Sequence, residues 1–182
     1  MPKRVVLTGF MGAGKSALGP RLAQQLGWDF IDLDDEIVRT EQRSIAQIFE
    51  AVGEDRFRAL ERNALAKALD FESVVLALGG GAIETAANRQ LLQQDRETLL
   101  LYLEAPLEVL IERCEQQQLE RNAVRRPVLE KRAELTERFQ RRRPLYEMAD
   151  WTIDTTGQTL DELVNAVVAR WNAAPWNQPP ER

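Results

Sequence analysis

The sequence predicts an α/β fold of three layers (α/β/α), in which helices cover both faces of a five-stranded parallel sheet. Two observations lead to this prediction. Short apolar runs alternate with segments of helical periodicity, and a glycine-rich loop joins the first apolar run to the first helical segment. The runs that we expect to form strands are residues 3–8, 29–32, 73–78, 98–103 and 151–153.

The first helix is expected directly after the loop. Leu18, Leu22 and Leu26 recur every four residues and form one apolar face, and Gly27 marks the end of the helix. Pro20 lies inside it and cannot donate a hydrogen bond to the carbonyl four residues earlier. We therefore expect a local kink at this proline.

Further helices are predicted between the later strands. Ser44 and Gln47 form a capping box that opens a helix over residues 45–52. A longer helix is expected over residues 56–69, and Pro106 is placed to begin another.

Length and composition favour one domain. A chain of 182 residues with 44% hydrophobic residues suits a single core, which we assign to residues 1–171. Within it, segment 115–131 is charged and weakly periodic, and we expect it to form a mobile lid. The tail of residues 172–182 contains three prolines and is expected to be disordered.

Charge and residue usage exclude several classes of function. The net charge of −5 and the pI near 5.0 argue against a nucleic-acid partner. Cys114 is the single cysteine, and no signal peptide or membrane-length apolar stretch is evident, so we expect a cytoplasmic protein with no membrane partner. The absence of histidine excludes a Ser-His-Asp triad and histidine metal ligands.

The glycine-rich loop spans Gly9 to Ser16 and reads Gly-Phe-Met-Gly-Ala-Gly-Lys-Ser. It matches the phosphate-binding pattern GxxxxGK(S/T) at every fixed position. In such a loop, backbone N–H groups point at phosphate oxygens, and the following helix contributes its positive N-terminal end. Lys15 can then reach the β- and γ-phosphates, and Ser16 can bind Mg²⁺. The loop therefore predicts binding of a nucleoside triphosphate.

Carboxylates follow the second predicted strand. Ligands of an open parallel sheet bind beyond the carboxyl ends of the strands, which is where Asp32 and Asp34 lie. Asp32 is placed to bind Mg²⁺ together with phosphates, and Asp34 to hold an acceptor hydroxyl and accept its proton. The alternative is that these acids only cap a helix beginning at Glu36.

Three consecutive glycines, Gly79, Gly80 and Gly81, follow the third predicted strand. Because they lack β-carbons, they can bring backbone N–H groups against a substrate or a γ-phosphate. The alternative is a tight turn that binds no ligand.

Arginine side chains indicate an anionic substrate. Arg58, Arg126 and Arg142 each offer a planar fork that matches a carboxylate or a phosphate with two parallel hydrogen bonds. Taken singly, each can instead be a solvated surface side chain. Arg58 in particular can pair with Glu54 or Glu61 at helical spacing.

In their joint order, these motifs resemble the shikimate kinases, which belong to the nucleoside-monophosphate-kinase-like group of P-loop folds. The resemblance covers roughly residues 5–163. It rests on the phosphate loop, Asp32-Leu33-Asp34, Ser44-Ile45 with Ile48-Phe49, Gly53-Glu54 with Phe57-Arg58 and Glu61, Gly79-Gly80-Gly81, Arg126-Pro127, and Arg142 before Pro144-Leu145-Tyr146. It implies the strand order 2-3-1-4-5 and transfer of the ATP γ-phosphoryl group to the 3-hydroxyl of shikimate, in the synthesis of chorismate and the aromatic amino acids.

The resemblance also implies which residues bind the acceptor. Arg58 and Arg142 would bind the carboxylate of shikimate, and Asp34 its hydroxyl groups. Gly79, Gly80 and Gly81 would lie against its ring.

On the phosphoryl side, the resemblance assigns Ser16 and Asp32 to Mg²⁺. It makes Lys15, Asp34 and Arg126 the catalytic residues, with Arg126 arriving when the lid closes. The implied ATP-binding residues are Gly12, Ala13, Gly14, Lys15, Ser16, Ala17, Arg113 and Arg126.

Some alternatives stay open. The lid contains Arg125-Arg126-Pro127, and we choose Arg126 as the catalytic arginine because it abuts the proline. The rival functions are those of a related small-molecule kinase, such as a gluconate kinase, and of a nucleotide-binding module without transfer activity. Arg58, the triple glycine and Arg142 together favour shikimate, and we expect a monomer.

Overall fold

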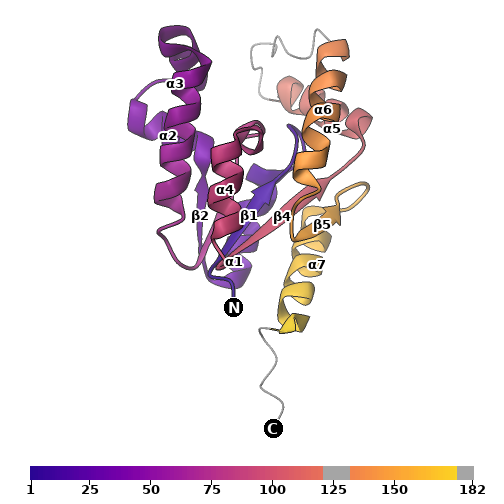
Figure 1. Ribbon diagram of the computed structural model, residues 1–182. Coiled ribbons are helices and arrows are strands. Elements are labelled where there is room, and N and C mark those ends of the chain that lie inside the picture. Colours follow the sequence, from indigo (N-terminus) through magenta and orange to yellow (C-terminus); the bar gives the residue numbers. More distant parts are fainter. Residues whose placement is uncertain (121–131, 176–182) are drawn as a thin grey trace.

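The predicted sheet is present in the computed structural model, which describes residues 1–120 and 132–175 (Figure 1). Within these residues, five parallel strands form one sheet in the order β2-β3-β1-β4-β5, as predicted. The strands are β1 (Arg4–Thr8), β2 (Asp29–Asp32), β3 (Val74–Ala77), β4 (Thr98–Glu104) and β5 (Trp151–Asp154).

Strand β1 occupies the centre of the sheet, paired with β3 on one side and β4 on the other. All five of its residues are buried, because helices cover both faces of a parallel sheet. This explains why the middle of the strand, Val5 to Leu7, is a continuous apolar run rather than an alternating pattern. Its register aligns Leu7 with Ala77 and with Leu101, so the carboxyl ends of three strands meet at one edge.

Helices pack on both faces of the sheet. On one face, α1 (Lys15–Leu26) contacts α7 (Leu160–Ala173), and the rings of Trp28 and Trp171 meet edge to face with centroids 5.2 Å apart. On the other face, α4 (Ala86–Gln94) crosses the front of the sheet in Figure 1 and contacts α3 (Ile45–Ala68). The remaining helices are α2 (Leu33–Glu41), the short 3-10 helix η1 (Ala82–Glu84), α5 (Leu107–Glu120) and α6 (Arg132–Tyr146).

Helix α3 contains both helices that were predicted on either side of Gly53. The chain breaks its helical geometry only locally there, where Gly53 adopts φ 76° and ψ 177°. A positive φ of this size favours glycine, which explains the residue at the break. The predicted capping box opens the helix: the backbone N–H of Gln47 donates to Ser44 Oγ at 3.2 Å, and Ser44 N–H donates to Gln47 Oε1 at 2.9 Å.

Helix α2 begins at Leu33, three residues before the predicted start at Glu36. The reason is that Asp32 is the N-cap, since its Oδ1 accepts from the backbone N–H of Asp34 at 3.1 Å. Helix α1 continues through Pro20 without interruption, so the proline does not divide the helix. A bend of the helix axis at this position stays a prediction.

The predicted lid and tail overlap two helices. Helix α5 continues to Glu120 and so includes the first residues of the expected lid, while residues 121–131 lie outside the described part of the chain. Helix α7 continues to Ala173, and Ala174 is buried, so the packed structure extends past the predicted boundary at residue 172. Residues 176–182 are not described.

An ion pair lies at the amino-terminal ends of β1 and β4, on the opposite side of the sheet from the carboxyl ends of the strands. The side chain of Arg4 is 8% exposed, and its Nε donates to Asp95 Oδ2 at 3.0 Å. Asp95 also accepts from Thr98 Oγ1 at 2.7 Å and from the backbone N–H of Glu97 at 2.9 Å. Burial raises the pKa of Asp95, but these hydrogen bonds outweigh burial and hold the pKa below its usual value.

We expect Asp95→Asn to lower the free energy of unfolding by about 2 kcal/mol at neutral pH, because it removes hydrogen bonds to a charge. A carboxyl with a lowered folded pKa stabilises the fold above its unfolded pKa of about 3.9, and this contribution is lost as the pH falls through the folded pKa. The difference from the parent protein should therefore shrink in strong acid. Urea unfolding at several pH values measures it.

The matched control for this prediction is Asp70→Asn, at an exposed aspartate just after α3. It should change the free energy of unfolding by less than about 0.5 kcal/mol. Equal effects of the two substitutions would contradict the role of the Arg4–Asp95 pair.

Candidate active site

A cavity of about 630 Å³ lies at the carboxyl ends of β1, β2 and β3. Most of the residues that the sequence indicated as functional line this cavity. They are Gly12, Gly14, Lys15, Ser16, Ala17, Asp32, Asp34, Arg58, Gly79, Gly80, Gly81 and Arg142. Residues from five separate parts of the chain therefore converge on one cleft.

The remaining predicted residues lie elsewhere. Ala13, within the phosphate loop, is buried at 2% exposure. Arg113 on α5 donates to Thr155 Oγ1 at 2.8 Å and to the Thr155 carbonyl at 2.6 Å, which ties α5 to the segment after β5. Arg126 lies outside the described residues.

The phosphate loop joins β1 to α1 through glycines with positive φ. Gly12 has φ 77° and Gly14 has φ 96°, conformations that disfavour side chains. A β-carbon on Gly12 would lie 2.5 Å from the Leu110 carbonyl oxygen and 2.9 Å from Cys114 Sγ, so the loop packs directly on α5. Packing against α5 therefore holds one side of the loop, and its other side lines the cavity.

Lys15 lies across the phosphate loop. Its Nζ donates to the carbonyls of Gly9 at 2.7 Å and Phe10 at 3.1 Å. Burial lowers the pKa of this ammonium to about 8, although the nearby charges of Asp34 and Asp32 act in the opposite direction. A bound phosphate would supply the negative charge that favours the protonated form.

Ser16 and Asp32 form the pair that suits a hard cation. Ser16 Oγ donates to Asp32 Oδ2 at 2.6 Å, while Asp32 Oδ1 caps α2. The helix cap and the predicted Mg²⁺ role of Asp32 are therefore compatible, since one oxygen caps the helix and the other accepts from Ser16. A hydroxyl and a carboxylate next to a phosphate loop fit Mg²⁺, which takes few protein ligands and keeps several waters.

Three side chains that the sequence predicts to bind the acceptor lie close to the triple glycine. A β-carbon on Gly79 would lie 2.6 Å from Asp34 Oδ1, and one on Gly81 would lie 2.8 Å from Arg58 Nη2 and 3.1 Å from Arg142 Nη2. Side chains at these two positions would therefore occupy the space of the carboxylate and the guanidinium groups. The glycine run permits a close approach here rather than only a turn.

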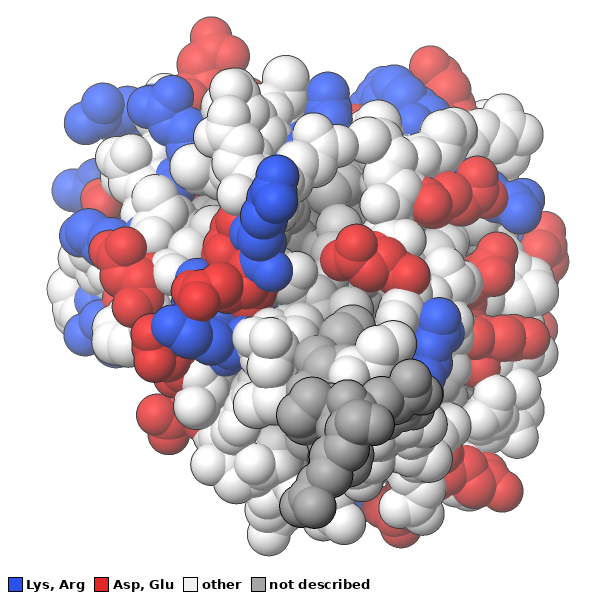
Figure 2. All heavy atoms as spheres, turned by 60° about the horizontal axis from the view of Figure 1, so that its bottom comes forward, with Lys and Arg blue, Asp and Glu red and all other residues white. Residues whose placement is uncertain are grey.

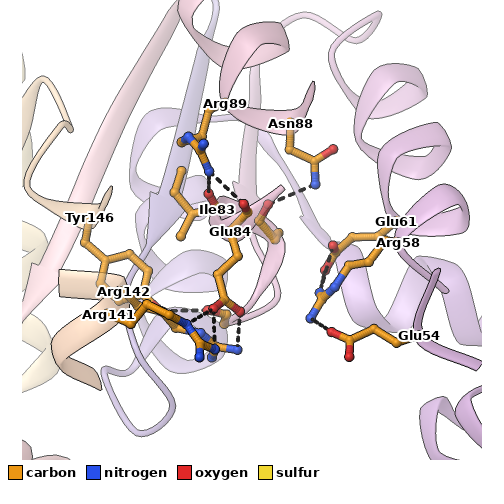
Figure 3. A network of polar contacts seen from close by, with 12 residues as sticks. Glu54, Arg58, Glu61, Ile83, Glu84, Asn88, Arg89, Arg141, Arg142 and Tyr146 are labelled. Carbon is orange, nitrogen blue, oxygen red and sulfur yellow. Dashed lines mark hydrogen bonds and ion pairs between the residues drawn. The ribbon is translucent and has the colours of Figure 1, made fainter. Parts of the chain in front are cut away.

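Each of the two arginines is paired with acids. Arg58 Nη1 donates to Glu61 Oε2 at 3.0 Å, and Nη2 donates to Glu54 Oε1 at 3.2 Å, so the expected local pairs are present beside the cavity (Figure 3). Arg142 is buried, donates to Glu84 and lies over the Phe10 ring at 5.8 Å.

Two carboxylates near these arginines have raised pKa values. Burial raises the pKa of Asp34, and the neighbouring Asp32 adds to the shift. Burial likewise raises the pKa of Glu61, although Arg58 partly offsets it.

Sequence reasoning missed two residues at this site. Glu84 accepts from Arg142, and the hydroxyl of Tyr146 donates to the Gly80 carbonyl at 2.6 Å. Tyr146 belonged to a quoted motif without a role. Glu84 follows the triple glycine closely, which is the one signal that could have drawn attention to it.

The family model for shikimate kinase matches residues 11–172 of this chain. The chain belongs to the shikimate kinase family. A curated shikimate kinase from Salinibacter ruber is 40% identical over 92% of this chain and 83% of its own length. The solved shikimate kinase from Acinetobacter baumannii in complex with shikimate has a TM-score of 0.82 at 34% identity, covering 95% of this chain and 94% of that one.

Gluconate kinases, the alternative kinase class, share the fold of this chain. A solved gluconokinase from Sinorhizobium meliloti has a TM-score of 0.64 and covers 93% of each chain, but it is only 23% identical. This likeness extends to the architecture alone. Membership of the shikimate kinase family therefore supports ATP-dependent phosphorylation of shikimate over the gluconate alternative.

We expect Lys15 to take up a proton when ATP binds above about pH 8. In the free protein much of this amine is neutral there, whereas phosphate oxygens favour the ammonium form and raise its pKa. ATP affinity should consequently fall by up to about tenfold per pH unit above that range. Calorimetry in two buffers of different ionisation enthalpy measures the uptake.

The matched variant is Lys15→Arg, because a guanidinium stays charged throughout this range. It should bind ATP without the proton uptake. The prediction is wrong if the parent protein and the variant show the same pH dependence.

Proposed function

We propose that the cavity transfers the γ-phosphoryl group of ATP to the 3-hydroxyl of shikimate, giving shikimate 3-phosphate and ADP. The observation that carries this proposal is the meeting of Arg58 and Arg142 at Gly81, beside Asp34 at Gly79 and next to the phosphate loop. A site for an anion, a site for a hydroxyl and a site for phosphates thus share one cleft.

The acceptor side matches the chemistry of shikimate, which carries one carboxylate and three hydroxyl groups. Arg58 and Arg142 present guanidinium groups toward the same glycine, where a carboxylate can receive hydrogen bonds from both. Asp34 can accept a hydrogen bond from the hydroxyl that attacks. Gly79, Gly80 and Gly81 leave room for the ring because they have no side chains.

Asp34 need not be a strong base. Phosphoryl transfer depends mainly on positioning and on electrostatic stabilisation, so a carboxylate that holds the acceptor oxygen in line is sufficient. The raised pKa of Asp34 makes it a somewhat better proton acceptor than an exposed aspartate.

The phosphoryl side uses the loop and α1. Backbone N–H groups of residues 12–17 would bind the phosphates, and Lys15 would leave the Gly9 and Phe10 carbonyls for the γ-phosphate. Ser16 and Asp32 would hold Mg²⁺, which when bound neutralises charge on the phosphates. Arg126 would reach the γ-phosphate from the lid and help to exclude water, and Arg113 would lie near the adenine.

The surface of the protein agrees with small-molecule partners. Figure 2 shows acidic and basic side chains intermixed over the face that it presents, rather than a broad basic patch. None of the helices in the described part has the length and apolar character of a membrane span. A monomer in the cytoplasm, without a nucleic-acid or membrane partner, is the state that we propose.

An assay of ADP release tests the proposal. ATP and Mg²⁺ are supplied with shikimate, quinate, gluconate or nucleoside monophosphates in turn, and ADP is measured by a coupled reaction. We expect release with shikimate well above that with the other acceptors. Release with gluconate in place of shikimate, or binding of ATP with no release for any acceptor, would favour one of the two rival functions.

We expect Gly81→Ala to raise the KM for shikimate by about tenfold to a hundredfold, because the new β-carbon displaces both guanidinium groups from their productive positions. The KM for ATP should change little. Steady-state kinetics with each substrate in turn measure both values.

Gly80→Ala is the comparison variant, since its β-carbon would come no closer than 3.8 Å to any protein neighbour and so reduces the room for the ring without displacing the arginines. Its KM for shikimate should rise less than that of Gly81→Ala. A similar loss in both variants would speak against the displacement of the arginines as the cause.

A further inference from the structure

Glu84 is a carboxylate bound by two arginines at the side of the cavity. Its Oε2 accepts from Arg142 Nη2 at 2.6 Å. Its Oε1 accepts from Arg141 Nε at 3.0 Å and from Arg141 Nη2 at 2.8 Å. Figure 3 shows the side chain of Glu84 pointing to both guanidinium groups, while Arg58 approaches from the other side with its own acids.

The backbone that carries Glu84 is firmly fixed. The amide of Asn88, a fully buried residue, donates to the Ala82 carbonyl at 2.9 Å. Arg89 Nη1 donates to the carbonyls of Ile83 at 2.8 Å and Glu84 at 2.7 Å. These contacts hold η1, the turn that follows the triple glycine, so the Glu84 carboxylate keeps a fixed position relative to the glycines.

The carboxylate of Glu84 is charged at neutral pH. Burial raises its pKa, but the hydrogen bonds from Arg142 and Arg141 outweigh burial and leave the pKa below its usual value. Besides Glu84, Arg142 has a side-chain hydrogen bond with Tyr146 and lies over the Phe10 ring. Its side chain is 9% exposed, and its buried Nε has no hydrogen-bond partner among the described residues. A guanidinium removed from water in this way depends on its acidic partner for its position.

The two arginines that face Gly81 are supported in different ways. Arg58 pairs with Glu61 three residues away on the same helix, so local helical geometry aligns that pair. Arg142 lies on α6, and its partner comes from η1, 58 residues earlier. Only tertiary packing brings this second pair together.

We propose that Glu84 is a positioning residue for substrate binding: it holds the Arg142 guanidinium beside Gly81, where that group binds the carboxylate of the acceptor. Glu84 acts through Arg142 and does not itself contact the substrate. This inference rests on the proposed function.

Glu84→Ala tests the proposal in the full-length protein. The KM for shikimate should rise on the order of tenfold, while the kcat and the KM for ATP stay within about twofold, because the defect lies in one charge-assisted contact of the acceptor. Glu84→Gln keeps the shape and a hydrogen-bond acceptor but removes the charge, and should give a smaller rise. An unchanged or lower KM for shikimate in both variants would overturn the proposal.

An uncharged analogue of shikimate distinguishes a loss of Arg142 positioning from a general disruption of the site. The carboxamide of shikimate lacks the anion that Arg142 binds, so its KM should be the same for the parent protein and for Glu84→Ala. An equal rise for shikimate and for the carboxamide would show a merely structural role and would overturn the proposal. The comparison with Glu84→Gln guards against a folding defect in the alanine variant.

Glu147→Ala is the matched control. Glu147 also pairs with an arginine of α6, since its Oε1 accepts from Arg143 Nε at 2.7 Å, but this pair is half exposed and away from the cavity. Its kinetics should equal those of the parent protein. If the parent protein does not phosphorylate shikimate, the proposed function fails; if it does and Glu84→Ala has the parent KM, the positioning role alone fails.

Discussion

The pairing of β1 with β3 is the constraint on which the active site depends. Leu7 lies opposite Ala77, and the backbone N–H of Leu78 donates to the Leu7 carbonyl at 3.0 Å, just where both strands end. The phosphate loop therefore leaves the sheet beside the triple glycine. Because both strands are buried and hydrogen-bonded along their length, the points at which the two loops leave the sheet are fixed relative to each other.

Charge compensation around the cavity follows from this geometry. Arg58 and Arg142 are drawn out of water toward Gly81, and each has a glutamate partner that offsets part of the cost of desolvation. Lys15 differs, because it donates to backbone carbonyls and its pKa is lowered by burial. The cations proposed to bind the acceptor are thus already paired in the free protein, whereas Lys15, proposed to bind phosphate, would gain most from its ligand.

Much of the fold was predictable because central parallel strands are continuous apolar runs and because the loop between β1 and α1 has a specific residue pattern. The predicted starts of other elements were less accurate. Helix α2 begins early because Asp32 serves both as a cap and as a partner of Ser16, a double role that residue type does not reveal. The two helices predicted around Gly53 are present on either side of a kink, where that glycine adopts non-helical φ and ψ.

The sequence by itself determined the phosphate loop, the strand order through family resemblance, and the residues of the cleft that belong to motifs. These features depend on local patterns, in which the residues that act together lie within a few positions of each other. Tertiary structure alone decided that Arg58 and Arg142 meet at Gly81 and that Glu84 supports Arg142. The physical reason is that such a contact joins side chains from separate elements, and its distance is set by the packing of α6 against η1 rather than by any spacing along the chain.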